Sequence, residues 1–430
     1  MASRFLRLQI LFIFFFLSPS LLPAQLKNLK ANLKEIDEYA AKAGQDWRVP
    51  GFAMAIVKDD SVVFAKGYGV RELGKPTSVD ARTLFAIASN SKAFTAAALA
   101  ILVDEGKIKW DDPVTKYLPW FQMYDPYVTR EMMVRDLLCH RSGLATFGGD
   151  LIWYGSTYSR EEVVRRIRYL KPASSFRTRY GYQNIMFIAA GLVVEAVTGK
   201  SWDDFVKARF FAPLGMTTSN TSVKDFKGTD NFATPHNETD GKINVIHYVN
   251  VDGIGAAGAI NSCVAEMAQW LRLQLGRGTY KGNKIFSAAR SREMWTPHIM
   301  FQIGEQAEKQ NPTTHFSGYG LGWGLRDYQG RKVASHGGGL DGMISQVALI
   351  PEENLGVVVL TNSETSLSSF LVNKVFDVFL GAPKRDWSGE ALARQKENQE
   401  AQKAAAKRIE DERVPGTKPS LALGQYTGMY

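Results

Sequence analysis

Ser89 and Lys92 are the residues whose types and spacing best suit covalent catalysis. They form a Ser-x-x-Lys sequence shortly before the apolar stretch AAALAILV, which predicts a helix. The free backbone N–H groups at the start of such a helix favour a developing anion. Residues three apart share a helix face, so Lys92 can reach the Ser89 hydroxyl and, if buried, act as its base. Ser-x-x-Lys alone is weak evidence, because a serine that caps a helix before a surface lysine is common.

Two later segments offer the other groups that acyl transfer needs. Tyr182-Gln183-Asn184 provides a phenol that can shuttle a proton and an amide that can both donate to and accept from a substrate. His336 is followed by three glycines, which let backbone N–H groups approach a substrate without side-chain obstruction. Such an edge can supply an oxyanion-hole donor, although a His-Gly-Gly-Gly sequence also suits a simple tight turn.

The helices and strands that must position these residues are distributed unevenly along the chain. Short apolar runs near both ends predict strands, and the region from about 85 to 280 is helix-rich. We therefore expect an α+β fold: an antiparallel sheet formed from both ends of the domain, flanked by helices, with an inserted helical subdomain. The expected elements are helix 29–44, strands 51–57, 61–67, 319–325, 333–335, 342–350 and 355–361, and helix 366–379.

Taken together and in this order, the three segments resemble the signature of class C β-lactamases and penicillin-binding-protein-like serine hydrolases. This group includes family VIII esterases and D-stereospecific peptidases of the S12 type. Related class A enzymes carry Ser-x-x-Lys, Ser-Asp-Asn and Lys-Thr-Gly, and Tyr-x-Asn replaces the second element in class C. The resemblance spans about residues 30–380, with further similar segments at 137–144 (LLCHRSGL), 211–216 (FAPLGM), 257–260 and 319–324 (YGLGWG).

The resemblance implies a β-lactamase/transpeptidase-like fold and a secreted serine hydrolase that forms an acyl-enzyme on Ser89. Its substrates would be amides or esters of the D-amino-acid peptide, ester or β-lactam type. Lys92 and Tyr182 would manage the protons, with the choice of base left open. The implied substrate-binding residues are Asn184, His336, Gly338 and Gly339, with the N–H groups of Ser89 and Gly339 forming the oxyanion hole.

His336 departs from the family pattern, because the lactamases and transpeptidases carry a lysine there that attracts a substrate carboxylate. A neutral imidazole, with an ordinary pKa near 6.5, would hold a carboxylate less strongly. We therefore expect little β-lactamase activity, while peptidase and esterase activity stay open. The alternatives are a non-catalytic penicillin-binding or sensor protein that uses the same cleft, which would have no need of a base, and a cell-surface interaction module that uses the C-terminal tail.

The two ends of the chain differ from the domain. Basic residues, the apolar run LQILFIFFFL and then small residues predict a signal peptide at 1–24 and a secreted or periplasmic protein with no membrane span after cleavage. An uncleaved membrane anchor is the alternative. Residues 25–383 would form the hydrolase domain, and 384–419, rich in Ala, Glu, Lys and Arg, a helical linker. Residues 420–430 predict the start of a further β domain.

Composition narrows the choice of partners. The 430 residues are 45% hydrophobic and 22% charged, as in an ordinary globular protein. The net charge of +9 is spread along the chain without a dense basic block, which disfavours nucleic acid. The histidines show no metal-binding spacing, so no metal or cofactor is implied. We expect Cys139 and Cys263 to be buried thiols, with a disulfide as the alternative, and the partner to be a small-molecule or short-peptide substrate, such as cell-wall material could supply.

Overall fold

The computed structural model describes residues 21–226 and 229–428, and the side chains from residue 28 onward. The chain divides into two compact units after Lys384. The apolar run that predicts a signal peptide lies outside the described residues, so that assignment stays a prediction.

The first unit is built on one sheet with the strand order β2-β1-β14-β13-β12-β11-β10-β9, in which every neighbouring pair is antiparallel. The strands are β1 (Gly51–Lys58), β2 (Ser61–Gly69), β9 (Ile299–Met300), β10 (Ser317–Tyr319), β11 (Gly324–Tyr328), β12 (Arg331–Leu340), β13 (Met343–Ile350) and β14 (Leu355–Thr361). The remaining strands are two to four residues long and form separate two-stranded sheets. They pair as β3 (Phe85–Ala86) with β6 (Asn261–Ser262), β4 (His236–Thr239) with β5 (Lys242–Val245), and β7 (Thr279–Tyr280) with β8 (Asn283–Lys284).

The centre of the sheet joins segments that are three hundred residues apart in the sequence. Phe52 of β1 pairs with Thr361 of β14, and the register continues to Lys58 and Leu355. Both strands are almost wholly buried, which explains their continuous apolar sequences. The sheet formed from both ends of the domain, flanked by helices, is thereby confirmed.

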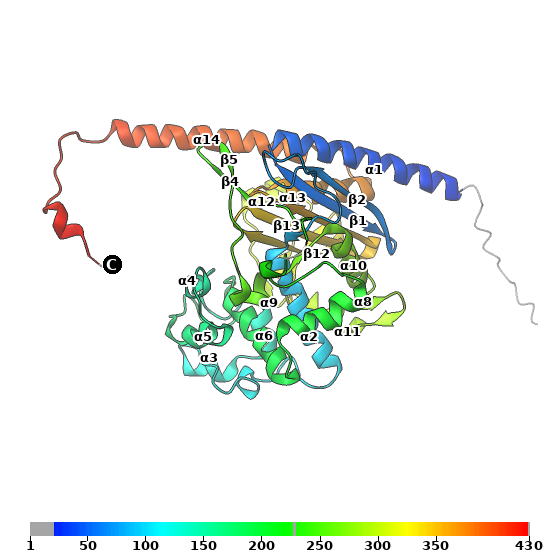
Figure 1. The fold of residues 1–430 in the computed structure, drawn as a ribbon, viewed down its shortest axis with the longest axis horizontal. Coiled ribbons are helices and arrows are strands. Elements are labelled where there is room, and N and C mark those ends of the chain that lie inside the picture. The colour runs from blue at the N-terminus through cyan, green and yellow to red at the C-terminus, as the bar shows by residue number, and fades with distance from the viewer. Residues whose placement is uncertain (1–20, 227–228, 429–430) are drawn as a thin grey trace, which may run out of the picture. The chain divides into compact units, whose positions relative to one another are not determined.

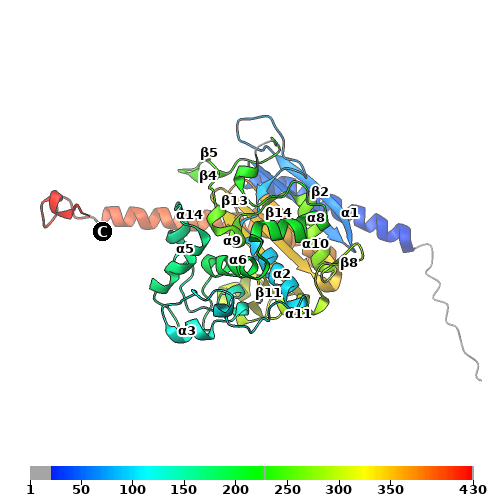
Figure 2. The same ribbon diagram turned by 60° about the horizontal axis from the view of Figure 1, so that its bottom comes forward.

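Helices cover both faces of the sheet (Figures 1 and 2). On one face, α13 packs on β13 and β14 and also contacts α1, whereas α10 packs on β14 and β1 from the helical side. The helices of this unit are α1 (Leu21–Asp46), α2 (Ser91–Asp104), α3 (Pro126–Glu131), α4 (Asp150–Trp153), α5 (Arg160–Arg165), α6 (Asn184–Thr198), α7 (Trp202–Val206), α8 (Ala212–Leu214), α9 (Gly255–Gly258), α10 (Val264–Leu275), α11 (Ala288–Met294), α12 (Glu305–Gln310) and α13 (Leu367–Leu380).

One expected strand is wrong. The sequence predicts one continuous strand over 319–325, but residues 320–323 form the connection between β10, which ends at Tyr319, and β11, which begins at Gly324. Gly322 has a φ of +75°, and the Gly320 N–H donates to the carbonyl of Trp323 over 2.8 Å. The glycines therefore turn the chain. Leu321 and Trp323, which lie between them, are apolar because the whole turn is buried.

The second unit holds α14 (Trp387–Asp411) and a short 3-10 helix, η9 (Leu423–Tyr426). Residues 420–428, where the sequence suggests the start of a β domain, contain this 3-10 helix and no strand. Among the described residues, no single helix has the length and hydropathy of a membrane span, although α6 together with the 202–214 helical segment passes that test as a bent pair.

Candidate active site

Ser89 lies in a 3-10 turn, η1 (Ala88–Asn90), that leads directly into α2. Most residues of α2 are buried, so this helix runs through the core of the helical half of the domain. Ala88 has a positive φ of 48°, which is costly for a residue with a side chain. The apolar sequence of α2 therefore places Ser89 at the boundary between the helices and the sheet.

Lys92 is fully buried and is bound to neutral oxygen atoms. Its Nζ donates to the Ser89 Oγ over 3.0 Å, to the Asn184 Oδ1 over 2.7 Å and to the Ala257 carbonyl over 2.8 Å. Burial lowers the pKa of Lys92 to about 7, and the charge of Asp150 opposes that shift. A lysine with this pKa is partly unprotonated near neutral pH and can accept the proton of the Ser89 hydroxyl.

Tyr182 lies close to both Ser89 and Lys92. The centroid of its ring is 4.8 Å from the Lys92 Nζ, and its phenol hydrogen bonds with Ser89. Burial raises the pKa of Tyr182 above its usual value, while the hydrogen bond with Ser89 acts in the opposite direction. The phenol is therefore protonated at neutral pH, as a proton donor or relay must be.

Asn184 is the first residue of α6, and its amide is used within the protein. The Oδ1 accepts from Lys92, and the Nδ2 donates to the Asp150 Oδ2 over 2.8 Å. Asp150 begins α4, and its other oxygen accepts from the Trp153 indole over 3.0 Å. Sequence reasoning missed Asp150, because an aspartate after two glycines reads as a turn or helix start and gives no sign of the contact with Asn184.

β12 carries the glycines close to Ser89. A Cβ on Gly338 would lie 2.2 Å from the Ile87 carbonyl oxygen, 2.3 Å from the Ser345 Oγ and 3.0 Å from the Ser89 N. Only glycine fits there. The Ser345 hydroxyl, on β13, donates to the Ile87 carbonyl over 2.7 Å and holds the strand against the segment before the serine. Gly339 follows Gly338 at an exposed position of the strand.

His336 is buried beside the site with both ring nitrogens occupied. The Nε2 shares a hydrogen bond of 2.7 Å with the Tyr319 hydroxyl, and the Nδ1 lies 2.5 Å from the Gly337 carbonyl. Burial, with a smaller contribution from Lys92, lowers the pKa of His336 to about 3. The imidazole is therefore neutral, and it would have to exchange an internal hydrogen bond to hold a substrate carboxylate.

His140 lies next to Tyr182 in a scaffold loop. The Gln183 N–H donates to the His140 Nδ1 over 3.0 Å, and the ring centroids of His140 and Tyr182 are 4.3 Å apart. His140 has a φ of +58°. The Gly181 N–H donates to the His140 carbonyl over 2.8 Å, so His140 holds the backbone on both sides of Tyr182.

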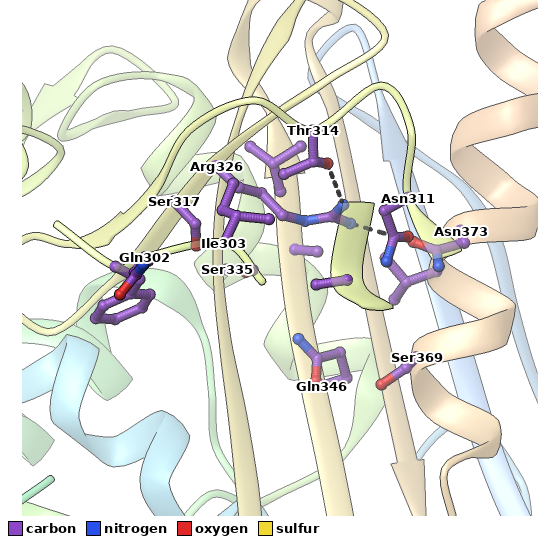
Figure 3. Close-up of a pocket in the computed structure, with 15 residues that line it drawn as sticks. Gln302, Ile303, Asn311, Thr314, Ser317, Arg326, Ser335, Gln346, Ser369 and Asn373 are labelled. Atoms are coloured by element: carbon purple, nitrogen blue, oxygen red, sulfur yellow. Dashed lines mark hydrogen bonds between the residues drawn. The ribbon is translucent and has the colours of Figure 1, made fainter. Parts of the chain in front are cut away.

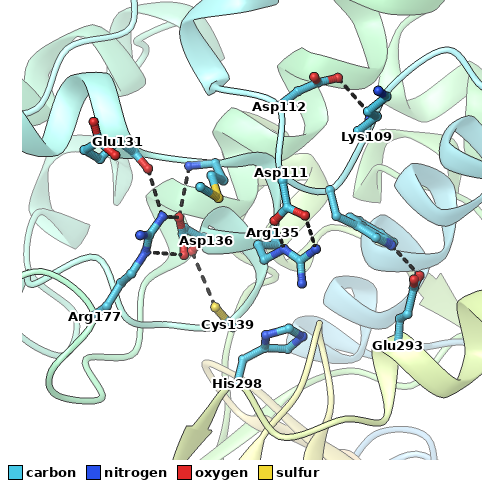
Figure 4. A network of polar contacts seen from close by, with 12 residues as sticks. Lys109, Asp111, Asp112, Glu131, Arg135, Asp136, Cys139, Arg177, Glu293 and His298 are labelled. Carbon is cyan, nitrogen blue, oxygen red and sulfur yellow. Dashed lines mark hydrogen bonds and ion pairs between the residues drawn. The ribbon is translucent and has the colours of Figure 1, made fainter.

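A buried carboxylate anchors this loop (Figure 4). Asp136, which is 0% exposed, accepts from the Arg177 Nη2 over 2.7 Å and from the Arg141 Nε over 2.8 Å. Its Oδ2 also accepts from the Met133 N–H over 3.0 Å. The Arg141 Nη1 also donates to the His298 carbonyl over 3.1 Å, so the cluster links three segments of the helical half.

The structure thus brings the predicted residues into one site. Ser89, Lys92 and Tyr182 are in mutual contact, Asn184 and His336 flank them, and the glycines of β12 lie at the serine. Among the described residues, no group of three or more His, Cys, Asp or Glu side chains could hold a metal ion. Cys139 and Cys263 are buried free thiols, as predicted.

Comparisons with known proteins agree on one family. The family model described as Beta-lactamase matches residues 36–380. The unguisins hydrolase ungD' of Aspergillus campestris is 31% identical over 408 residues, covering 89% of this chain and 73% of that protein.

Solved structures give the same result. The octameric penicillin-binding protein homologue from Pyrococcus abyssi superposes with a TM-score of 0.72 at 25% identity, covering 81% of this chain and 78% of that one. The D-amino acid amidase from Ochrobactrum anthropi superposes with a TM-score of 0.64 at 23% identity, covering 81% and 98%. The second likeness is one of fold.

Proposed function

Because the chain belongs to the beta-lactamase family, we propose that it is a serine hydrolase that cleaves amide or ester bonds through an acyl-enzyme on Ser89. The observation that carries this proposal is the 3.0 Å contact between the Ser89 hydroxyl and a buried lysine whose pKa is lowered to about 7. A serine paired with an unprotonated amine is an activated nucleophile. The fungal relative is named a hydrolase, which is consistent with this activity.

In the proposed reaction, the Ser89 Oγ attacks the substrate carbonyl and the Lys92 Nζ takes the hydroxyl proton. The N–H groups of Ser89 and Gly339 stabilise the negative charge that develops on the carbonyl oxygen. When the bond to the leaving group breaks, Tyr182 relays the proton to that group. A water molecule then attacks the carbonyl of the Ser89 ester. Its proton passes through Lys92 and Tyr182 to the Ser89 Oγ, and the carboxylic acid is released. Lys92 is the base in preference to Tyr182, because burial lowers the pKa of the amine but raises that of the phenol.

The proposed substrates carry no carboxylate close to the bond that is cut. His336 is neutral, and both of its ring nitrogens are hydrogen bonded within the protein. It offers no positive charge to an anion, in contrast to a lysine at the same place. Uncharged esters and end-blocked or cyclic peptides, including those with D-residues, are therefore better candidates than β-lactams.

The basic and apolar start of the chain supports export as part of this proposal. A leader cut after Ala24 would give a mature protein that begins at Gln25. The mass of the N-terminal peptide of protein recovered from its producing cells tests this. A chain that still begins at Met1 would contradict it.

The test of the activity is intact-protein mass spectrometry after treatment with a fluorophosphonate probe, with turnover of a p-nitrophenyl ester measured alongside. We expect one adduct, located on Ser89. Ser89→Ala should lose the adduct and lower ester turnover by at least about 10⁴-fold.

The neighbouring Ser91 provides the control. Its hydroxyl donates to the Ala88 carbonyl over 2.7 Å and accepts from the Ile260 N–H over 3.1 Å, whereas Lys92 Nζ binds the Ser89 hydroxyl, so Ser91→Ala should keep the Ser89 adduct. An adduct that persists in folded Ser89→Ala would refute the assignment. Acylation without turnover would instead support the non-catalytic binding protein.

A further inference from the structure

A cavity lies on the face of the sheet that points away from Ser89 (Figure 3). Side chains alternate between the two faces of a strand. Gly338 and its partner Ser345 face Ser89, so Ser335, three residues before Gly338 on β12, and Gln346, next to Ser345 on β13, face the opposite side. These two residues line a cavity of about 440 Å³ that α13 and the segment 301–314 border. That volume is in the range of small-molecule sites.

Arg326 is the one charged residue among the fifteen that line this cavity. Its Nη2 donates to the Asn373 Oδ1 over 3.2 Å, and its Nη1 donates to the Thr314 Oγ1 over 3.5 Å. Both partners are neutral. Within the part of the chain that the structure describes, no carboxylate pairs with Arg326.

The nearest acid on the same strand is already occupied. Asp327 points to the other face, where its carboxylate accepts from the backbone N–H groups of His315 and Phe316 over 2.8 Å each and contacts the His315 ring. Burial lowers the pKa of the Arg326 guanidinium, because the charged form is poorly solvated there. Arg326 is only partly exposed, and a partly desolvated charge without a counter-ion is costly, so an anionic ligand would offset that cost.

The rest of the lining indicates which anion fits. Neutral hydrogen-bonding side chains, among them Gln346 and Asn311, line the same cavity, and Ile303, Val333 and Val372 add an apolar wall. A planar guanidinium binds a carboxylate with two parallel hydrogen bonds. A phosphate dianion would meet only one positive charge. A monoanion with a short apolar body matches both parts of the cavity.

We propose that this cavity is a second, non-catalytic site that binds a small organic monocarboxylate through Arg326. The inference is independent of the proposed hydrolase activity, since the two sites lie on opposite faces of the sheet.

The experiment measures ¹⁹F NMR titrations of the full chain with 4-fluorophenylacetate and with its neutral isostere, 4-fluorophenylacetamide. We expect saturable binding of the acid and at least about ten-fold weaker binding of the amide. Arg326→Gln should weaken binding of the acid by at least about ten-fold, and Arg326→Lys should weaken it less. Ser89→Ala should bind the acid as the wild type does, which separates this cavity from the site around Ser89.

Two further variants keep the test decisive. Ser369 is an exposed lining residue, so Ser369→Trp fills the cavity without touching the charge and should abolish binding even if Arg326→Gln folds poorly. Arg331→Gln, on β12 but paired with Glu353 outside the cavity, should bind normally. The proposal would be overturned if both Arg326→Gln and Ser369→Trp bound the acid as the wild type does. It would also be overturned if the wild type showed no saturable binding at about 10 mM acid, or if inorganic phosphate competed better than the acid binds.

Discussion

Two polar clusters in the helical half of the domain are built from similar residues and differ in how their charges are balanced. In one, Asp136 is buried between Arg141 and Arg177, so each charge has an opposite charge in direct contact. In the other, the hydrogen-bond partners of Lys92 among the described residues are neutral oxygens, and the acid whose charge acts on it, Asp150, is bound to the Asn184 amide instead.

This difference separates a structural site from a reactive one. The directly paired charges of Asp136, Arg141 and Arg177 anchor the loop that contains Arg141. Lys92 is held by good hydrogen bonds, but its charge is not neutralised, so burial lowers the pKa of the amine to about 7. The amide of Asn184 keeps the carboxylate of Asp150 near enough to act on Lys92 but too far to form an ion pair.

The largest expected effect is on the rate when Lys92 is removed. Lys92→Met should lower kcat/KM for a p-nitrophenyl ester by about 10³-fold, because the base is lost. Urea unfolding should show equal or greater stability, since an apolar side chain of similar length replaces an uncompensated charge. Lys92→Arg is the matched control, because it keeps the charge but cannot accept a proton and should be equally slow. Near-wild-type rates in folded Lys92→Met would remove Lys92 from the mechanism.

The next effect is on stability when Asp136 is removed. Asp136→Ala should lower the free energy of unfolding by about 3 kcal/mol, because Arg141 and Arg177 lose their shared partner. Asp111→Ala is the control: Asp111 pairs with Arg135 in the same region (Figure 4), but its side chain is 65% exposed, so the loss should stay below about 1 kcal/mol. Equal losses measured by urea unfolding would show that the two ion pairs do not differ as argued.

The parts of this comparison that the sequence could predict are those carried by local patterns. Spacing within one helix turn places Lys92 at Ser89, and continuous apolar runs identify β1 and β14. Asp150 could not be predicted, because its role arises from a contact between two segments that are 34 residues apart. The same holds for Arg326, whose lack of a counter-ion depends on which face of β11 it occupies. In 319–325, apolar residues predicted a strand, but the glycines between them form a buried turn.

The smallest expected effect is the pH dependence of the rate. If the unprotonated Lys92 is the base, kcat/KM should rise with pH through an apparent pKa of about 7, by about ten-fold between pH 6 and pH 8. Asp150→Asn should move this limb to lower pH, because the charge of Asp150 raises the pKa of Lys92. A limb that does not move, or that moves upward, would contradict the coupling through Asn184.

The lowered pKa of Lys92 must also make the free energy of unfolding depend on pH, with a sign that can be worked out. The pKa of Lys92 is about 7 in the folded protein and about 10.5 in the unfolded chain, so between these values the unfolded chain binds more protons. The free energy of unfolding should therefore gain a contribution that rises with pH across this window. Urea unfolding of wild type and Lys92→Met at several pH values isolates that contribution, since other groups titrate alike in both. A difference that stays constant from pH 7 to pH 10 would mean that Lys92 remains charged, and the contrast with the Asp136 cluster would fail.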